Sequence, residues 1–178
     1  FVVLYKIGDN FAANMTIPYL LQLGFSRTDI GIVAKFIGFW ATLLGTFLGG
    51  LILMKVAYRP ALIFFGILQA VSTLVFVSLL FTGPQKTALS LVVAFENLSS
   101  GMGTSGLAAF MAKATDKRFT ATQYALFSSL MGIPRVITSS PAGYIAELLG
   151  WQQFFWFSTL LAIPGLLLLL LRGSRRWT

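Results

Sequence analysis

Six long apolar runs dominate this chain of 178 residues and constrain its fold more than any other feature. Each run has about 20 residues or more, which at 1.5 Å per residue is enough for a helix to cross a lipid bilayer. The predicted helices cover residues 1–22, 29–54, 60–82, 87–112, 122–147 and 151–171. The runs do not alternate between apolar and polar residues, so a β-barrel is not expected. We therefore expect an all-α integral membrane protein, in which residues 1–178 form a single bundle of six transmembrane helices.

The composition argues against several classes of function. Charged residues make up 10% of the chain, against about 25% in ordinary soluble domains. The chain has neither histidine nor cysteine, so it lacks the commonest general base and the commonest metal ligand. We expect no cofactor, no metal and no enzyme activity. The net charge of +8 does not predict nucleic-acid binding, because the cations are spread through the breaks between apolar runs.

Lysines and arginines in these breaks predict how the helices are oriented, because cytoplasmic loops carry an excess of cations. One set of helix ends carries eight cations, and the opposite set carries only Arg27 and Lys86. The eight are Lys55, Arg59, Lys113, Lys117, Arg118, Arg172, Arg175 and Arg176. We expect the cation-rich side, and with it both chain termini, to face the cytoplasm.

Small residues predict the faces on which the helices pack. In the second run glycine recurs every seven residues and ends in a GxxxG pattern, and in the fourth run two glycines share a face with Ser99. Such spacings let helix backbones approach closely. The predicted packing glycines are Gly31, Gly38, Gly45, Gly49, Gly103 and Gly106.

Five ionisable residues lie inside apolar runs, where a charge is expensive and faces a partner or a cavity. They fall in the first, second, fourth and fifth runs, so we expect those four helices to surround a polar interior. Amides and hydroxyls extend the same faces, as at Lys6, Asn10 and Asn14, which have i, i+4, i+8 spacing. The candidates for substrate binding or proton coupling are Glu96, Arg135, Lys35, Asp9, Lys6, Asn10, Asn14, Asn97, Gln123 and Tyr124.

Two interpretations of these charges stay open. Lys6 could pair with Asp9, and Glu96 with Lys35 or Arg135, in which case the charges only hold helices together. Alternatively the charges form a transport site, and their sum of +1 favours an anionic substrate. Burial favours a neutral carboxyl group and a nearby cation favours the ionised one, so Glu96 is a candidate carrier of a coupled proton.

The stretch ENLSSGMGTSG, residues 96–106, contains two patterns that are known from enzymes. Its glycines spell the GxGxxG of a dinucleotide-binding turn, but that turn needs a preceding strand and an acid about 20 residues later. Residues 103–106 spell GxSG, which looks like the nucleophile motif of rhomboid intramembrane proteases. Its Ser105 would need a histidine as base, and Lys35 is the only substitute. An intramembrane serine protease is therefore a remote alternative.

Other stretches resemble the major facilitator superfamily. GYIAELLGW, residues 143–151, is similar to the junction between the fifth and sixth helices of a facilitator half. Gly50, Lys55 and Arg59 match that superfamily's loop motif, whereas Met54 stands at its acidic position. The resemblance implies one half of a major facilitator fold, in which the first, second, fourth and fifth helices surround the cavity and the third and sixth support them from outside.

Three further stretches are similar to muropeptide permeases of the AmpG type: residues 4–9, LYKIGD; residues 96–104, ENLSSGMGT; and residues 118–126, RFTATQYAL. The likeness covers nearly the whole chain, but only the C-terminal half of such a permease. It implies proton-coupled import of anhydro-muropeptides, which are peptidoglycan fragments, across a bacterial inner membrane by alternating access, with a missing N-terminal half as partner. It also implies that acetyl-coenzyme A transporters are distant relatives, so a carrier for another anionic solute, such as acetyl-coenzyme A or a sugar derivative, stays an alternative.

Overall fold

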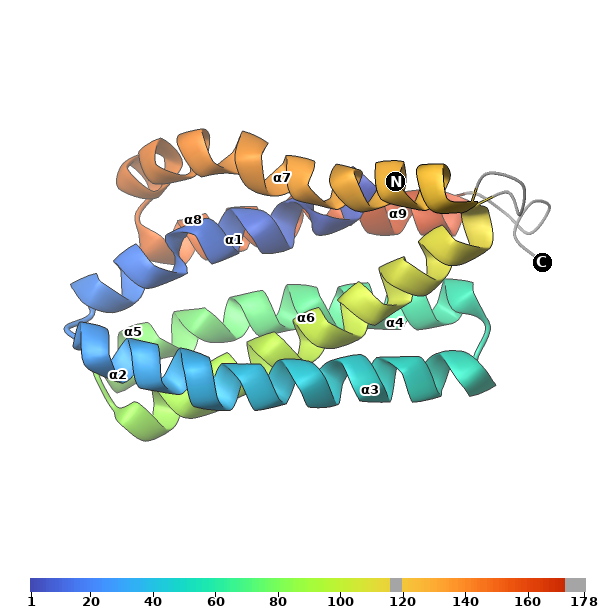
Figure 1. Cartoon of the computed structure of the whole chain (residues 1–178). Coiled ribbons are helices and arrows are strands. Elements are labelled where there is room, and N and C mark those ends of the chain that lie inside the picture. The colour runs from blue at the N-terminus through green and yellow to red at the C-terminus, as the bar shows by residue number, and fades with distance from the viewer. Residues whose placement is uncertain (116–119, 172–178) are drawn as a thin grey trace.

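The computed structural model describes residues 1–115 and 120–171, and all regular elements within these ranges are helices. The expectation of an all-α fold is confirmed. Several elements follow one another without a break and form longer helical segments, which Figure 1 shows lying side by side. In chain order the segments are α1 (Val2–Gln22); α2 (Arg27–Ile32), π-helix η1 (Val33–Gly38) and α3 (Phe39–Lys55); α4 (Tyr58–Val75), 3₁₀-helix η2 (Phe76–Ser78) and α5 (Leu79–Thr82); α6 (Lys86–Ala114); α7 (Thr120–Leu149); and α8 (Trp151–Leu160) with α9 (Ile163–Leu171).

Three of these segments are long and apolar enough to cross a membrane. They are Arg27–Lys55, Tyr58–Thr82 and Trp151–Leu170. Helices α1, α6 and α7 are less apolar, because they carry most of the polar residues of the cavity described below. A total of six passes, the single domain and the cytoplasmic placement of both termini stay predictions. Lys117, Arg118, Arg172, Arg175 and Arg176, on which the predicted orientation partly rests, lie outside the described residues.

The helices pair in a pattern with pseudo-twofold symmetry. α1 packs along α7 and α3 packs along α6, while α1 also contacts α8 and α4 also contacts α6. If the first, second and third segments are exchanged with the fourth, fifth and sixth, the pair α1–α7 becomes α6–α3, and the pair α1–α8 becomes α6–α4. In Figure 1, α7 lies on one side of the bundle and the α2–η1–α3 segment lies on the opposite side, with α1 and α6 between them.

An aromatic core joins α8 to the first half of the chain. Phe154 and Phe155 are completely buried. The Phe154 ring stacks on Phe11 of α1 with centroids 5.2 Å apart, and the Phe155 ring stacks on Phe76 of η2 at 5.6 Å. Stacked and edge-to-face aromatic pairs of this kind stabilise a core beyond their buried area, so this cluster fixes α8 behind α1.

Two tyrosines of α1 bind α4 and η2 at matching positions. The Tyr5 hydroxyl donates a hydrogen bond to the carbonyl oxygen of Leu62 at 3.0 Å, and the Tyr19 hydroxyl donates one to that of Phe76 at 2.8 Å. In each bond the tyrosine and its partner are 57 residues apart in sequence, so α1 runs parallel to the α4–η2 segment. Both side chains are buried, and a buried tyrosine hydroxyl normally needs such a partner.

Glycines bring α6 into backbone contact with α3. The position that a Cβ atom would take at Gly45 is occupied by the backbone of Leu98, and the same position at Gly49 lies 2.9 Å from the Cα atom of Met102. From the other side, a Cβ atom at Gly101 would lie 2.5 Å from a carbonyl oxygen of α3. Backbone atoms cannot move aside as a flexible side chain can, so these positions require glycine.

A second face of α6 packs against α4 through the other two predicted glycines. A Cβ atom at Gly103 would lie 2.5 Å from the side-chain oxygen of Gln69, and one at Gly106 would lie 2.9 Å from the side chains of Leu62 and Phe65. Helix α6 is therefore held between α3 and α4.

Gly31 differs from the prediction that all six glycines serve helix packing. A Cβ atom at Gly31 would meet no heavy atom within 4 Å, and Gly31 lines a cavity instead. Gly38 is buried, and a Cβ atom there would lie 3.3 Å from the side chain of Asn97, so this glycine does pack closely against α6. The physical reason for the difference at Gly31 is η1, which begins two residues after it and ends at Gly38. A π-helix has wider turns than an α-helix, so a seven-residue spacing across it no longer keeps residues on one face.

We expect Gly45→Ala to destabilise the fold, because the added methyl group meets the Leu98 backbone. Overpacking of this kind costs about 1–3 kcal/mol, which thermal unfolding of the purified protein would measure as a lower melting temperature. Gly50 lies on the same helix, and no heavy atom lies within 4 Å of its Cβ position. Gly50→Ala is therefore the matched control and should leave the melting temperature unchanged or slightly higher. Equal melting temperatures for the two variants would contradict the close contact.

Candidate functional site

A cavity of about 960 Å³ lies between α1, α2–η1, α6 and α7. Every residue that lines it comes from these elements, except Phe76 of η2. Helices α3, α4, α8 and α9 contribute no lining residue, so the cavity is bordered by the first, second, fourth and fifth segments, as their charges suggest. Eight of the predicted site residues line it, namely Lys6, Asp9, Asn10, Asn14, Lys35, Glu96, Asn97 and Arg135.

Gln123 and Tyr124 do not line this cavity. They lie in the first turns of α7, and Tyr124 is exposed. Arg135, which does line the cavity, follows Tyr124 by about 17 Å along the helix. The sequence placed all three on one helix, but a helix of 30 residues extends well beyond the cavity that its middle borders.

Lys6 and Asp9 form a buried ion pair on α1. The Nζ atom of Lys6 lies 2.8 Å from an oxygen of Asp9, and the two side chains are only 7% and 13% exposed. Lys6 also contacts the Ser100 hydroxyl of α6 at 3.4 Å. The Asn10 amide, one turn along the same face, donates to the backbone carbonyl of Lys6 at 2.8 Å. The local pairing that the i, i+3 spacing suggested is thus present.

Glu96 forms neither of the two salt bridges that one interpretation of the sequence allowed. Within residues 1–115 and 120–171, the ion pairs are Lys6–Asp9 and Lys86–Asp29, so neither Lys35 nor Arg135 pairs with Glu96. The Ser72 hydroxyl of α4 donates to Glu96 at 2.6 Å, and the Ser99 hydroxyl donates to Ser72 at 2.8 Å. The Glu96 carboxyl group also interacts with that of Asp9. The interpretation in which Glu96 pairs with Lys35 or Arg135 is therefore not what the structure shows, since both cations line the cavity as exposed residues.

Two asparagines that line the cavity are each hydrogen-bonded to a neighbouring helix. Asn14 of α1 donates to the Thr138 hydroxyl of α7 at 3.0 Å and to the carbonyl oxygen of Arg135 at 3.3 Å. Asn97 of α6 accepts a hydrogen bond from the Thr42 hydroxyl of α3 at 3.1 Å. These are the two helix pairs that the pseudo-twofold pattern exchanges, so in each pair an asparagine side chain at the edge of the cavity is hydrogen-bonded to the neighbouring helix.

Several contributing residues were not predicted from the sequence. Arg27 was counted as a loop cation, but it lines the cavity, and its spacing of eight residues from Lys35 could have indicated a shared face. Ser72 was missed because the third run carries no charge. Its polar neighbours Gln69 and Thr73, in an otherwise apolar helix, were the available signal. The π-helix η1, which carries Lys35 in the cavity wall, has no recognisable sequence signal, although such segments are frequent at functional sites.

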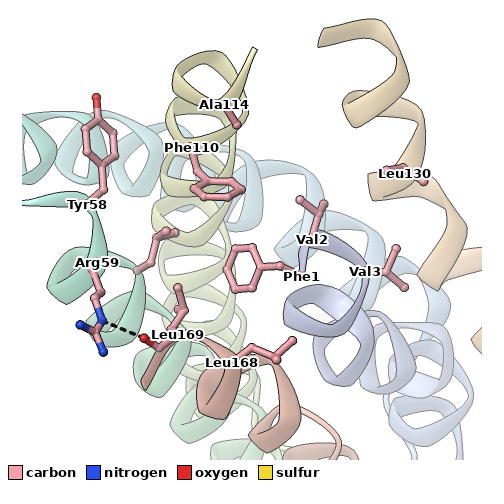
Figure 2. Close-up of a pocket in the computed structure, with 11 residues that line it drawn as sticks. Phe1, Val2, Val3, Tyr58, Arg59, Phe110, Ala114, Leu130, Leu168 and Leu169 are labelled. Carbon is pink, nitrogen blue, oxygen red and sulfur yellow. Dashed lines mark hydrogen bonds between the residues drawn. The ribbon is translucent and has the colours of Figure 1, made fainter. Parts of the chain in front are cut away.

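A second pocket, of about 260 Å³, lies where α1 begins, and it is mostly apolar. Figure 2 shows Phe1 and Phe110 facing each other within it and Arg59 at its edge. Arg59 is already bonded, because its side chain donates to the carbonyl oxygens of Leu169 at 2.7 Å and Leu170 at 2.6 Å. These are among the last carbonyl groups of α9, which an arginine can cap. The polar cavity is therefore the better candidate for binding a hydrophilic solute.

The two enzyme-like motifs both lie inside α6. Ser105 donates its hydroxyl hydrogen to the Met102 carbonyl at 2.8 Å, and its oxygen lies against Gly49 of α3. Ser105 does not line the polar cavity, whereas Lys35 does. The GxSG residues therefore take part in helix packing rather than facing the cavity with a base.

Comparison with known proteins places this arrangement in a family. Residues 1–177 match the Major Facilitator Superfamily. The "Anhydromuropeptide permease" of Escherichia coli (strain K12) is 40% identical over 170 residues, which are 95% of this chain and 35% of that protein. The "Putative transporter AmpG 1" of Rickettsia bellii is 38% identical over 170 residues, covering 96% of this chain and 42% of the relative. The "Putative transporter AmpG 4" of Rickettsia conorii is 33% identical over 174 residues, covering 98% and 42%.

These matches confirm the resemblance to the AmpG type that three sequence stretches suggested. The chain spans 35% to 42% of the length of the curated relatives it matches. By its fold and by its sequence over nearly its whole length, the chain belongs to the Major Facilitator Superfamily.

Proposed function

We propose that this chain is one six-helix half of a secondary transporter that imports anhydro-muropeptides across a bacterial inner membrane by alternating access. The observation that carries the proposal is the polar cavity, which gathers eight predicted polar residues between four helices of an apolar bundle. Buried charges in such a bundle commonly mark a substrate or ion pathway. The muropeptide assignment rests on the name of the relative from Escherichia coli.

The charges of the cavity suit an anionic solute with many polar groups. Arg27, Lys35 and Arg135 line it without an ion-pair partner among the described residues. Asp9 is already neutralised by Lys6. Asparagine amides and hydroxyl groups add donors and acceptors of the kind that sugar and peptide groups need. The excess of free cations supports a solute that carries carboxylate groups.

The contact between Asp9 and Glu96 supports proton coupling. Two ionised carboxyl groups repel each other and offer only acceptor oxygens. Their contact is favourable when one of them carries a proton, which then serves as the shared hydrogen. We infer that Glu96 is the group that takes up and releases this proton, since Asp9 is already paired with the cation of Lys6.

Transport by alternating access needs a second half around the same site. The relatives are more than twice as long as the matched region, so we propose that an N-terminal half completes the cavity. In this arrangement all six segments cross the membrane, and both ends of the chain face the cytoplasm. Exposed apolar side chains on α3, such as Trp40 and Phe47, then face lipid or the other half.

The decisive experiment is uptake of labelled anhydro-muropeptide into vesicles that contain the full-length protein. We expect uptake that saturates with substrate and depends on an imposed proton gradient. Unlabelled anhydro-muropeptide should compete, whereas acetyl-coenzyme A should not. Absence of uptake at every gradient tested would exclude this substrate.

Glu96→Gln should abolish accumulation driven by a proton gradient, because an amide cannot release a proton at any working pH. Exchange of labelled for unlabelled substrate, which needs no net proton movement, should continue. Glu147 is exposed and lies outside the cavity, so Glu147→Gln is the matched control and should accumulate substrate normally. Normal gradient-driven accumulation by Glu96→Gln would show that the proton is carried elsewhere.

Single cysteines test the proposed orientation, since this sequence contains none. Ala57→Cys lies between α3 and α4, and Gln85→Cys lies between α5 and α6. In intact cells with an otherwise cysteine-free transporter, a membrane-impermeant maleimide should label the cysteine at position 85 and spare the one at position 57. The opposite labelling would invert the topology, and labelling of both would contradict a membrane-spanning α4–α5 segment.

A further inference from the structure

A small cavity lies beside Asp9, between α1, α4, α8 and α9. Asp9 lines this cavity and also lines the large polar cavity on its other side. Asp9 therefore lies between the large polar cavity and the small one.

Gln69 of α4 lines the small cavity and has an unsatisfied donor. The side chain is buried, with 5% of its surface exposed. Among the buried side-chain nitrogen and oxygen atoms of the described residues, the Nε2 atom of Gln69 is the one without a hydrogen-bond partner. Native proteins leave few buried polar groups unpaired, and an ordered water is a common explanation for those that remain.

The hydroxyl groups around this cavity can accept hydrogen bonds but have no free hydrogen to donate. The Thr73 hydroxyl donates to the carbonyl oxygen of Gln69 at 3.1 Å. The hydroxyls of Ser158 and Thr159 donate to the carbonyl oxygens one turn earlier in α8, those of Phe154 at 2.8 Å and Phe155 at 2.9 Å. A hydroxyl group has one hydrogen and two lone pairs. The cavity therefore presents one free donor, on Gln69, together with several acceptors that include the Asp9 carboxyl group.

We propose that the small cavity binds one ordered water molecule, which accepts a hydrogen bond from Gln69 Nε2 and donates one to the Asp9 carboxylate. The cavity leaves about 10 Å³ for the centre of a water molecule, and a single water needs about 10–15 Å³ on that measure. A water molecule also needs two to four polar partners, which Gln69, Asp9 and the hydroxyl oxygens supply.

A sodium ion fits the same space less well. Lys6 already lies 2.8 Å from Asp9 and neutralises it, so a sodium ion would add an uncompensated charge in an apolar surrounding. The amide hydrogens of Gln69 would also point at the cation instead of at an acceptor. The charges and the free donor both favour a neutral ligand that can accept one hydrogen bond and donate two.

The water gives α4 a second connection to the charged cluster. Ser72 of α4 bonds directly to Glu96, and Gln69, one turn earlier, reaches Asp9 through the water. Both interacting carboxyl groups are then held from behind by a helix that contributes no residue to the large cavity. This inference stands whether or not the transported solute is a muropeptide.

The test uses the purified full-length transporter and Gln69→Met, which keeps the length and flexibility of the side chain but removes the donor. An ordered solvent peak between Gln69 and Asp9 should appear in a high-resolution map of the wild type and be absent from that of the variant. Gln69→Met should melt a few degrees lower than the wild type, because the water and Asp9 lose a partner. Gln153→Met, at an exposed position of α8, is the control and should melt with the wild type.

Opposite results separate this inference from its alternatives. If the Gln69 amide has no partner at all, Gln69→Met removes a buried unpaired group and the melting temperature should rise or stay constant, which would overturn the proposal. A wild-type melting temperature that rises with sodium but not with choline, and loses this response in Gln69→Met, would replace the water by a cation. An empty cavity in the wild-type map would also overturn it. None of these readouts depends on transport.

Discussion

The ion pair between Lys6 and Asp9 is the interaction around which the interior of this protein is organised. A charge in an apolar bundle must find a partner or a polar cavity, and these two residues find each other on neighbouring turns of α1. Ser100 of α6 contacts the pair, and Glu96 of the same helix interacts with Asp9. Because the pair is buried, α6 must bring polar groups to α1 at this depth. Ser72 must in turn reach Glu96 from α4.

Close helix packing makes this arrangement possible. Gly45 and Gly49 of α3 and Gly101 of α6 leave no room for a side chain between the two helices. The tight contact on one face of α6 and the glycine-lined contact with α4 on another fix the rotation of this helix. The direction in which Glu96 points from α6 is therefore set by contacts between backbones and not by contacts between flexible side chains. Hydrogen bonds of Asn14 and Asn97 further join the two symmetry-related helix pairs, α1 with α7 and α6 with α3.

The sequence predicted the helices and most of the cavity because both depend on simple energetic rules. Apolar runs predict membrane-spanning helices, and charges within them predict which helices face a polar interior, as Lys6, Lys35 and Arg135 show. Partners across the bundle are harder to predict, since they depend on helix rotation and on local departures from the α-helix. A cation was one possible partner for Glu96, but Glu96 bonds to Ser72, which lies in a run without charges. Gly31 lost its predicted packing role because the π-helix that follows changes the register.

The two tyrosine bonds of α1 have a mechanical consequence. Tyr5 and Tyr19 bind carbonyl groups at the same sequence separation, so a shift of α1 along the α4–η2 segment would break both bonds together instead of one after the other. The aromatic contacts of Phe11 and Phe76 with α8 oppose the same movement. Helices α1, α4 and α8 therefore form a rigid frame whose members cannot slide individually. Any change in the width of the cavity must therefore move α2–η1, α6 or α7 relative to this frame, and a movement of α7 would break the two hydrogen bonds by which Asn14 joins it to α1.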